Sequence, residues 1–492
     1  MTTLVVTGKL AENTVKRSVQ NDAEVLVLDI EVASFITPAL LRRSLPEKKY
    51  DLILIPGLAS GDFSGLEKET GTPIRLGPKH AVDLGFVLSY TGDIAFSRKV
   101  PACELLLDKR RSNALERVAE LEDRASPALF LKGVKLGGNS RMKVMAEIVD
   151  AAHLTGQELT NKIIYFAKLG ADIIDLGMSM DTEPHEAGAA VKIAKSVTDL
   201  PLSIDTLDPV LINAALDAGV DAVLSLNSGN INEVRDNIVR NLATVVIIPD
   251  CVEEIESLFN NIESARKMGI NNIIADPVLE PPGHGFVESI DRYYEFRKRD
   301  PKTPLFFGAG NVTELVDADS TGINAMLAGM AMELDANVLF TPEYSDKARG
   351  SVFELKTASV MMALSKERGS APKDLGIDLL FAKEKRRREI GSMPESPILA
   401  RESDGWHLDP AGCFKIDITA DEIRDGKLYP GKIVARTKKN SIAGTTAKEV
   451  LDTIVRLGLV SRLDHAAYLG RELMKAELAL KFKRSYSQDD EF

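Results

Sequence analysis

Between Met145 and Glu343 the hydrophobic residues gather in eight short runs rich in β-branched side chains, and longer stretches of helical character separate the runs. Runs of this length alternating with helical stretches predict βα units and a parallel sheet. Eight such units close a (β/α)8 TIM barrel. We therefore predict an α/β protein whose central barrel spans residues 126–370.

Every predicted strand leads into a polar residue near its carboxyl end. In chain order these residues are Asp150, Asp175, Asp205, Asn227, Asp250, Asp276, Asn311 and Glu343. The carboxyl ends of barrel strands meet at one end of the barrel, where the catalytic groups of such barrels lie. A ring of carboxylates and amides predicts a site for a polar, nitrogen-rich small molecule.

Helix signals fall between the strand runs, as a barrel requires. Thr155 and Glu158 have the spacing of a capping box, and Gly170 marks the end of the helix that they open. Residues 208–209, an Asp-Pro pair, predict the start of a later helix, which Gly219 ends.

Residues 1–125 predict a smaller α/β domain of unknown role. The runs TLVVTGK, EVLVLDI and DLILIPG are typical of buried strands. Glycines in the loops 55–63 and 71–80 permit tight turns and close approach to a ligand. A G-x-G-x-x-G motif and a Walker P-loop are absent from the sequence, so no nucleotide site is indicated. A purely structural domain with ordinary loops is the alternative.

Residues 371–492 predict an α+β domain, also of unknown role. The basic run 381–390 and the segment SMPESP indicate its boundary, and residues 115–128 indicate the linker before the barrel. Two short strand segments precede a helix capped by Thr446, and a long helix closes the chain. On that last helix His465 either faces a ligand or makes internal contacts.

Composition narrows the range of functions. The 492 residues include 61 Lys and Arg against 73 Asp and Glu, a formal net charge of −12, which argues against nucleic-acid or anionic-membrane partners. No apolar run reaches the roughly 20 residues that span a bilayer. The start of the chain lacks signal-peptide features, and three scattered cysteines without CxxC spacing predict a reducing, cytoplasmic location.

Four segments, GADIIDLG, PLSIDT, LSLN and IIADP, resemble in order and spacing the pterin-binding enzymes, which include dihydropteroate synthases and pterin-dependent methyltransferases. The whole chain resembles the dihydropteroate synthase-like proteins of methanogenic archaea and some methylotrophs, a group associated with tetrahydromethanopterin biosynthesis. The resemblance implies a barrel of the pterin-binding type, a pterin substrate and a homodimer.

The resemblance assigns pterin contacts to Asp205, Asn227 and Asp276, and Asp175 at a neighbouring strand end joins them. A pterin presents an exocyclic amine and a ring N–H side by side, and one carboxylate accepts both in charge-assisted bonds. An Asn supplies a donor and an acceptor for the remaining ring atoms. The alternative for Asp205 is a structural role at the strand end, and the alternative for Asp276 is a turn-forming role.

The chain departs from the synthase pattern where the diphosphate is held. The family's Asn at the end of the first strand is missing, so Asp150 or Glu147 would have to hold Mg²⁺. The Ser-Arg-Lys and Arg-x-His elements of the seventh and eighth strands are also missing. The cations left for a diphosphate are Lys347, Arg349 and His284.

Three functional hypotheses follow from the resemblance. The first is a transferase that joins a hydroxymethyl-dihydropterin diphosphate to an arylamine, in folate or tetrahydromethanopterin biosynthesis. The second is a methyltransferase that passes a methyl group from a pterin to a corrinoid partner, with Asn311 contacting the ring. The chain lacks a D-x-H-x-x-G corrinoid motif of its own. The third is a pterin-binding protein without catalysis.

Overall fold

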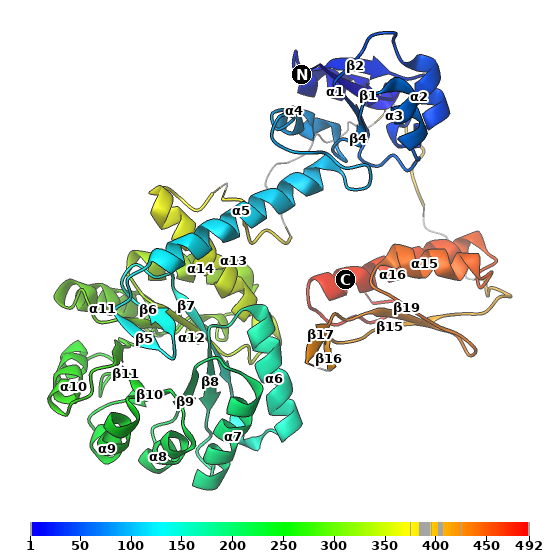
Figure 1. Ribbon diagram of the computed structural model, residues 1–492. Helices are drawn as coiled ribbons and strands as arrows, with labels where there is room; N and C mark the ends of the chain where they lie inside the picture. The colour runs from blue at the N-terminus through cyan, green and yellow to red at the C-terminus, as the bar shows by residue number, and fades with distance from the viewer. Residues whose placement is uncertain are drawn as a thin grey trace. The chain divides into compact units, whose positions relative to one another are not determined.

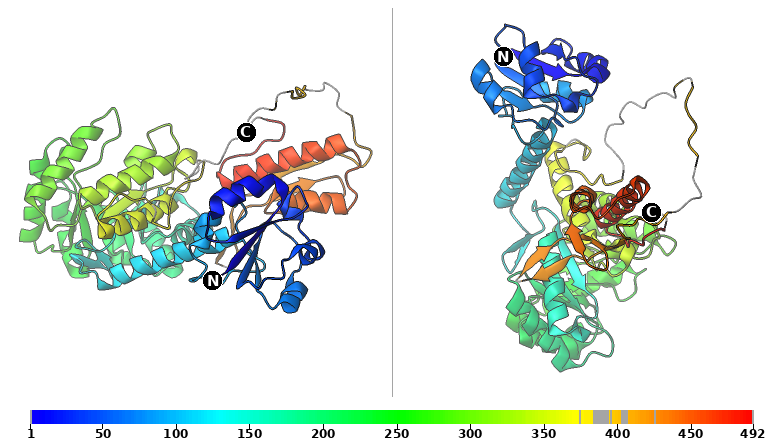
Figure 2. Two further views of the ribbon diagram at one scale, coloured as in Figure 1. Left: turned by 90° about the horizontal axis from the view of Figure 1, so that it is seen from above. Right: turned by 90° about the vertical axis from the view of Figure 1, so that its right-hand side faces the viewer.

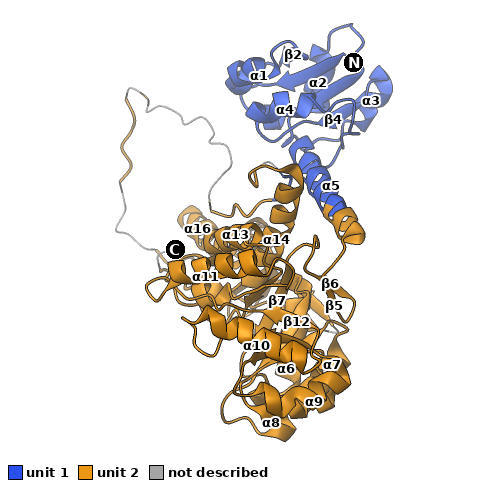
Figure 3. Ribbon diagram, turned by 90° about the vertical axis from the view of Figure 1, so that its left-hand side faces the viewer, with its two compact units in different colours: residues 1–117, 374–377, 384–393 blue, residues 118–373, 378–383, 394–492 orange. Residues whose placement is uncertain are grey.

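The computed structural model describes residues 2–373, 375–382, 394, 396–401, 407–424 and 426–490. The chain folds into two compact units (Figure 3). One unit is built mainly on the residues up to Arg117, and the other begins at Val118 and contains the barrel and the C-terminal region. The division falls within helix α5 (Ala102–Arg124), which runs through most of the predicted linker at 115–128.

The N-terminal unit contains a parallel sheet with helices packed on both of its faces. The strands are β1 (Thr3–Thr7), β2 (Glu24–Val27), β3 (Leu52–Ile55) and β4 (Ile74–Leu76), in the order β2-β1-β3-β4. The α-helices are α1 (Glu12–Val19), α2 (Pro38–Ser44), α3 (Ser64–Thr70) and α4 (Leu84–Leu88). Two separate hydrophobic clusters fill the space between the sheet and these helices. The predicted α/β domain is confirmed.

The second unit contains the predicted barrel. Its strands are β7 (Lys143–Ile148), β8 (Ile173–Gly177), β9 (Leu202–Asp205), β10 (Ala222–Leu226), β11 (Thr244–Ile247), β12 (Ile273–Ala275), β13 (Phe306–Phe307) and β14 (Val338–Thr341). They form an eight-stranded parallel sheet in the order β12-β11-β10-β9-β8-β7-β14-β13. A parallel bridge between Ala275 and Leu305 joins the two edges and closes the barrel. All eight predicted strands are confirmed.

The barrel helices form an outer layer around the strands (Figures 1 and 2). They are α6 (Gly156–Leu169), α7 (Pro184–Val197), α8 (Pro209–Ala218), α9 (Ile231–Asn241), α10 (Ile255–Lys267), α11 (Phe286–Arg299), α12 (Gly310–Thr313), α13 (Ser320–Glu333) and α14 (Ser351–Arg368). The capping box of Thr155 and Glu158 opens α6, and Gly170 ends it in the left-handed conformation. These predicted helix boundaries are confirmed.

A hairpin closes the amino end of the barrel. Its strands, β5 (Leu129–Leu131) and β6 (Val134–Leu136), are antiparallel. The side chains of Leu131 and Leu136 are buried in one cluster with inward-facing residues of the barrel strands. The interior is therefore filled with apolar side chains, and chemistry is left to the carboxyl ends of the strands.

The C-terminal region is α+β, as predicted. Its strands are β15 (Lys415–Ile418), β16 (Glu422–Arg424), β17 (Lys427–Tyr429), β18 (Ile433–Arg436) and β19 (Ser441–Gly444), followed by α15 (Ala447–Arg456) and α16 (Leu463–Lys481). Strands β15, β18 and β19 form one antiparallel sheet, and α15 and α16 pack on it (Figure 1). Thr446 caps α15 as expected. Residues 383–390 of the basic run and half of the segment SMPESP lie outside the described residues.

His465 on α16 makes internal contacts. Its Nδ1 lies 2.9 Å from Oδ2 of the buried Asp409. The backbone N–H groups of Ser461 and Arg462 donate to the same oxygen, so Asp409 ties its loop to the start of α16. Of the two predictions for His465, the arrangement agrees with the one in which the side chain makes internal contacts.

Within the described ranges, no helix is both long enough and apolar enough to cross a membrane.

Candidate functional site

Three carboxyl groups meet at the carboxyl ends of neighbouring barrel strands. Glu147 lies on β7, Asp175 on β8 and Asp205 on β9, and one oxygen atom from each lies within 4.8 Å of the others. The strand register brings them together, because Glu147 pairs with Asp175 and Gly177 pairs with Asp205. We call these three residues the acid cluster.

Hydroxyl groups on the next strands fix two members of the acid cluster. Ser203 pairs with Asp175 across the sheet and donates its hydroxyl to Oδ1 at 2.5 Å. Ser225 donates in the same way to Oδ1 of Asp205 at 2.6 Å. Asp175 is fully buried, and in the described part of the chain its Oδ2 has no hydrogen-bond partner.

Burial and mutual repulsion disfavour the ionised forms of the acid cluster. Burial, followed by the charges of Asp205, Asp150 and Glu314, raises the pKa of Glu147 to about 8. Burial, followed by the charges of Asp205 and Glu147, raises the pKa of Asp175 well above its ordinary value. Burial also raises the pKa of Asp205. The acid cluster must therefore retain protons or bind a cation at neutral pH.

Gly177 makes room for the carboxyl group of Glu147. A Cβ atom at position 177 would lie 2.4 Å from Oε1 of Glu147, far inside van der Waals contact. The Glu147 carboxyl group therefore lies directly against the backbone at the end of β8. Any larger residue at this position would displace the carboxyl group from the acid cluster.

Asp276 provides a fourth carboxyl group, directly after β12. The phenol of Tyr293 on α11 and the backbone N–H of Val278 both donate to its Oδ1 at 2.8 Å. Burial raises the pKa of Asp276 to about 6, the Tyr293 and Val278 bonds oppose this shift, and the charge of Asp205 adds to it. These two bonds leave Oδ2 of Asp276 for a ligand.

Each of the two predicted amide side chains, Asn227 and Asn311, makes a hydrogen bond within the protein. Oδ1 of Asn227 accepts the backbone N–H of Gly229 at 2.9 Å, and this bond leaves its amide N–H groups for other partners. Nδ2 of Asn311 donates to the carbonyl of Leu279 at 2.8 Å, so this side chain joins the loop after β12 to α12. Asn311 is exposed, and its Oδ1 is the atom that this bond leaves for a ligand.

Asp150 and Glu314 lie outside the acid cluster but act on it by charge. Asp150 is exposed and has a left-handed backbone with φ +50°. Glu314, which follows α12, accepts the backbone N–H groups of Tyr344 and Ser345 at 2.7 and 2.9 Å. Glu314 thereby fixes the loop after β14, and its charge contributes to the raised pKa of Glu147.

The three predicted cations bind or face groups outside the acid cluster. Lys347 pairs with Asp317 at 2.6 Å. Arg349 hydrogen-bonds the side chain of Tyr165, and His284 lies exposed in the loop before α11. The structure thus brings the carboxyl groups together but does not gather these three cations around them.

Sequence reasoning missed the residues that hold the carboxyl groups. Ser203 lies two residues before Asp205 on β9, so the period of two along a strand indicated that both side chains face the same way. Ser225 has a left-handed backbone with φ +61°, which breaks that period before Asn227, so the sequence contains no such signal for its bond to Asp205. The contributions of Tyr293 and Glu314 depend on packing between distant elements, and the sequence carries no local signal for either.

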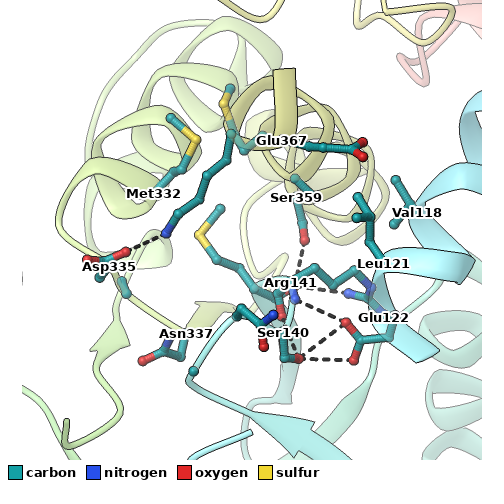
Figure 4. A pocket seen from close by; sticks show the side chains of 17 residues that line it. Val118, Leu121, Glu122, Ser140, Arg141, Met332, Asp335, Asn337, Ser359 and Glu367 are labelled. Atoms are coloured by element: carbon teal, nitrogen blue, oxygen red, sulfur yellow. Dashed lines mark hydrogen bonds and ion pairs between the residues drawn. The ribbon is translucent and has the colours of Figure 1, made fainter. Parts of the chain in front are cut away.

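A separate pocket of about 240 Å³ lies near the amino end of the barrel (Figure 4). Its lining comes from α5, α13, α14 and the segments before β7 and β14, and it includes Met332. The charged groups at its edge are paired within the protein, as in the bonds of Lys366 to Asp335 and of Lys143 to Glu122. The chemistry of the carboxyl groups therefore lies elsewhere, at the opposite ends of the strands.

Comparisons with known proteins match the chain from end to end. The uncharacterized protein MJ0107 of Methanocaldococcus jannaschii is 39% identical over 519 aligned positions, which cover 99% of this chain and 98% of that protein. A Ycf91-like protein of a Nostoc strain is 46% identical over 68 residues, 13% of this chain and 54% of that protein.

Three family models match separate regions. Residues 2–79 match a family of unknown function, DUF6513, and residues 408–489 match the family PterinBD-DUF4346. Residues 143–302, from β7 to just beyond α11, match the CO dehydrogenase/acetyl-CoA synthase delta subunit. The last match includes the acid cluster and Asp276.

Two solved structures are similar to about half of the chain. A dihydropteroate synthase from Yersinia pestis, in complex with a pterine-sulfa conjugate, is 18% identical with a TM-score of 0.40 and covers 49% of this chain and 99% of its own. A dihydropteroate synthase from Xanthomonas albilineans, in complex with 7,8-dihydropteroate, is 20% identical with a TM-score of 0.38 and covers 48% of this chain and 96% of its own.

Proposed function

The chain belongs to the family of the Methanocaldococcus jannaschii protein MJ0107, and we propose that its barrel is a pterin-dependent transferase. The observation that carries this proposal is the set of buried and half-buried carboxyl groups at the ends of β8, β9 and β12. Its substrate would be a reduced pterin, held at the carboxyl end of the barrel.

Asp276 and Asp205 suit the amino edge of a pterin. In each residue, protein donors fix Oδ1 and leave Oδ2 for a ligand. A pterin offers its exocyclic amine and adjacent ring N–H, two donors that a carboxylate accepts together. Burial disfavours ionisation of both carboxyl groups, so a ligand rich in N–H groups would stabilise their charged forms and bind best where the carboxyl groups are ionised.

The first candidate reaction joins a hydroxymethyl-dihydropterin diphosphate to an arylamine. The C–O bond breaks with its electrons leaving on the diphosphate, a C–N bond forms from the amine lone pair, and the amine loses one proton. Positioning and charge stabilisation would supply most of the catalysis. Lys347, Arg349 and His284 would have to turn towards the diphosphate, and Mg²⁺ would share its charge.

The second candidate reaction is methyl transfer, and the match of residues 143–302 to a CO dehydrogenase/acetyl-CoA synthase subunit favours it. Building an acetyl group from carbon monoxide requires a methyl group. In this reaction the N–CH₃ bond of a methylated pterin would break, the ring nitrogen would keep the electrons and take a proton, and the electron pair of a reduced, Co(I) corrinoid on a partner would form the new Co–CH₃ bond. Asn227 and Asn311 would contact the ring.

Calorimetric titration of the full chain tests the proposal with three ligands. They are a dihydropterin, its hydroxymethyl diphosphate with Mg²⁺, and a methylated tetrahydropterin. Tighter binding of the diphosphate supports the synthase reaction, and preference for the methylated ligand supports methyl transfer. If one of these ligands binds but no transfer occurs to an arylamine or a corrinoid, the protein is a pterin carrier. If none of the three binds, the proposal is wrong.

A further inference from the structure

We infer that Glu147, Asp175 and Asp205 form a binding site for a hard divalent cation, Mg²⁺ or Mn²⁺. This site shares Asp205 with the proposed pterin site but needs no pterin, so it goes beyond the proposed function and stands if that function fails. The prediction drawn from the sequence placed Mg²⁺ at Asp150 or Glu147, and the structure adds Asp175 and Asp205 to Glu147.

The distances within the acid cluster suit an ion with oxygen ligands. One oxygen from each residue lies within 4.8 Å of the others. Oxygens on opposite sides of Mg²⁺ lie about 4.0–4.2 Å apart, and around Ca²⁺ about 4.6–5.2 Å apart. A small inward movement of flexible side chains would complete three ligands, and water would supply the rest.

Asp175 gives an independent indication of a ligand. Its side chain is fully buried, and Oδ2 has no hydrogen-bond partner among the described residues, whereas Oδ1 accepts the Ser203 hydroxyl. A buried carboxylate oxygen with no partner lowers stability, because it has lost its hydrogen bonds to water and makes none within the protein. A cation in the acid cluster would satisfy this oxygen.

Glycine at position 177 gives a second indication. A Cβ there would lie 2.4 Å from Oε1 of Glu147, so only glycine leaves the carboxyl group in its place beside Asp175 and Asp205. The backbone of Gly177 belongs to β8 and does not have the left-handed conformation that would itself require glycine. The side chain of Glu147 therefore accounts for this glycine.

Charge and ligand type define the class of cation. The acid cluster carries up to three negative charges, and the carboxyl groups of Asp150 and Glu314 add to its negative potential. Lys347 pairs with Asp317, away from the acid cluster. A set of ligands made only of carboxylate oxygens favours Mg²⁺, Mn²⁺ or Ca²⁺ over the softer metals that prefer nitrogen and sulfur.

Titration with Mn²⁺, followed by electron paramagnetic resonance, tests the inference on the full chain after chelator treatment. We expect one saturable site per chain, from which Mg²⁺ displaces Mn²⁺. Glu147→Gln and Asp175→Asn should each weaken Mn²⁺ binding at least about tenfold, because each removes a charged ligand. The matched control Asp199→Asn, which changes an exposed carboxylate outside the acid cluster, should leave the affinity within about twofold, and Asp150→Asn tests the ligand predicted from the sequence.

Gly177→Ala provides a test that keeps all three ligands. The added methyl group should push the Glu147 carboxyl group out of the acid cluster and weaken Mn²⁺ binding about tenfold, and circular dichroism would confirm that each variant is folded. Absence of a saturable site would overturn the inference. It would also be overturned if Glu147→Gln and Gly177→Ala bound Mn²⁺ like the unchanged protein, or if only Asp150→Asn lost binding. Pterin titrations in chelator test the proposed function separately.

Discussion

At the scale of single residues, the half-buried carboxyl group of Glu147 couples stability to pH. Its pKa is about 8 in the folded protein against an ordinary value of 4.5, so the folded state binds more protons between these values. The free energy of unfolding should therefore fall as pH rises from about 4.5 to about 8. Without metal, Glu147→Gln should be about 1–3 kcal/mol more stable than the unchanged protein at pH 9.

Urea unfolding in chelator at pH 5 and pH 9 would measure this effect. The control is Glu288→Gln, which changes an exposed glutamate on α11. A Glu147→Gln variant whose stability relative to the unchanged protein was the same at both pH values would show that Glu147 is not an acid with a raised pKa.

Tyr293 should act on ligands through Asp276. Its hydroxyl donates to Oδ1 of Asp276 and opposes the rise in the pKa of that carboxyl group. Tyr293→Phe should raise the pKa of Asp276 further and lower stability by about 1 kcal/mol. Pterin affinity should then fall about threefold to tenfold near pH 6, and less at pH 8, where Asp276 is ionised in both proteins.

The neighbouring Tyr294 offers a matched control for that variant, since it lies on the same helix and is 52% exposed. Calorimetry at pH 6 and pH 8 would compare Tyr293→Phe with Tyr294→Phe. Equal affinities in the two variants at both pH values would contradict the role of Tyr293.

At the scale of elements, the contact between Glu147 on β7 and Gly177 on β8 can be tested by changing each residue alone and both together. Gly177→Ala alone should lower stability by about 1 kcal/mol or less, because the Glu147 carboxyl group lies at the end of a flexible side chain and can move away. In a Glu147→Ala variant, Gly177→Ala should leave the free energy of unfolding unchanged. Unfolding of the two single variants and the double variant would give a coupling energy of about 0.5–1 kcal/mol, and a coupling of zero would contradict the described contact.

The elements were predictable where local signals define them. Each barrel strand is a short apolar run that leads into a polar residue, and Thr155 with Gly170 defines α6 by capping chemistry alone. Asp175, Asp205 and Asp276 could be predicted as site residues because each lies near the carboxyl end of a predicted strand. Tyr293 joins the site only because its side chain reaches from α11 to Asp276, and Lys347 pairs with Asp317 across two loops, so these features needed the folded structure.

At the scale of the whole molecule, the match to MJ0107 includes the end domains as well as the barrel. The match to MJ0107 covers 99% of this chain and 98% of that protein, so both proteins keep the same arrangement of domains along the sequence. The β5–β6 hairpin closes the amino end of the barrel with buried leucines. A ligand must therefore reach the carboxyl groups from the other end, where the loops after the strands lie.

The central claim is that this end of the barrel binds a reduced pterin through Asp276. Calorimetric titration of a dihydropterin into the full chain, Asp276→Asn and the control Asp250→Asn tests it most directly. Asp250 also follows a strand, but its side chain is exposed, whereas Asp276 is half-buried and close enough to Asp205 for that charge to raise its pKa.

We predict that Asp276→Asn weakens dihydropterin binding at least about tenfold, because a charge-assisted double acceptor is lost, and that Asp250→Asn changes the affinity less than about twofold. Equal affinity in the unchanged protein and Asp276→Asn, or no binding of dihydropterin to any of the three, would contradict the account.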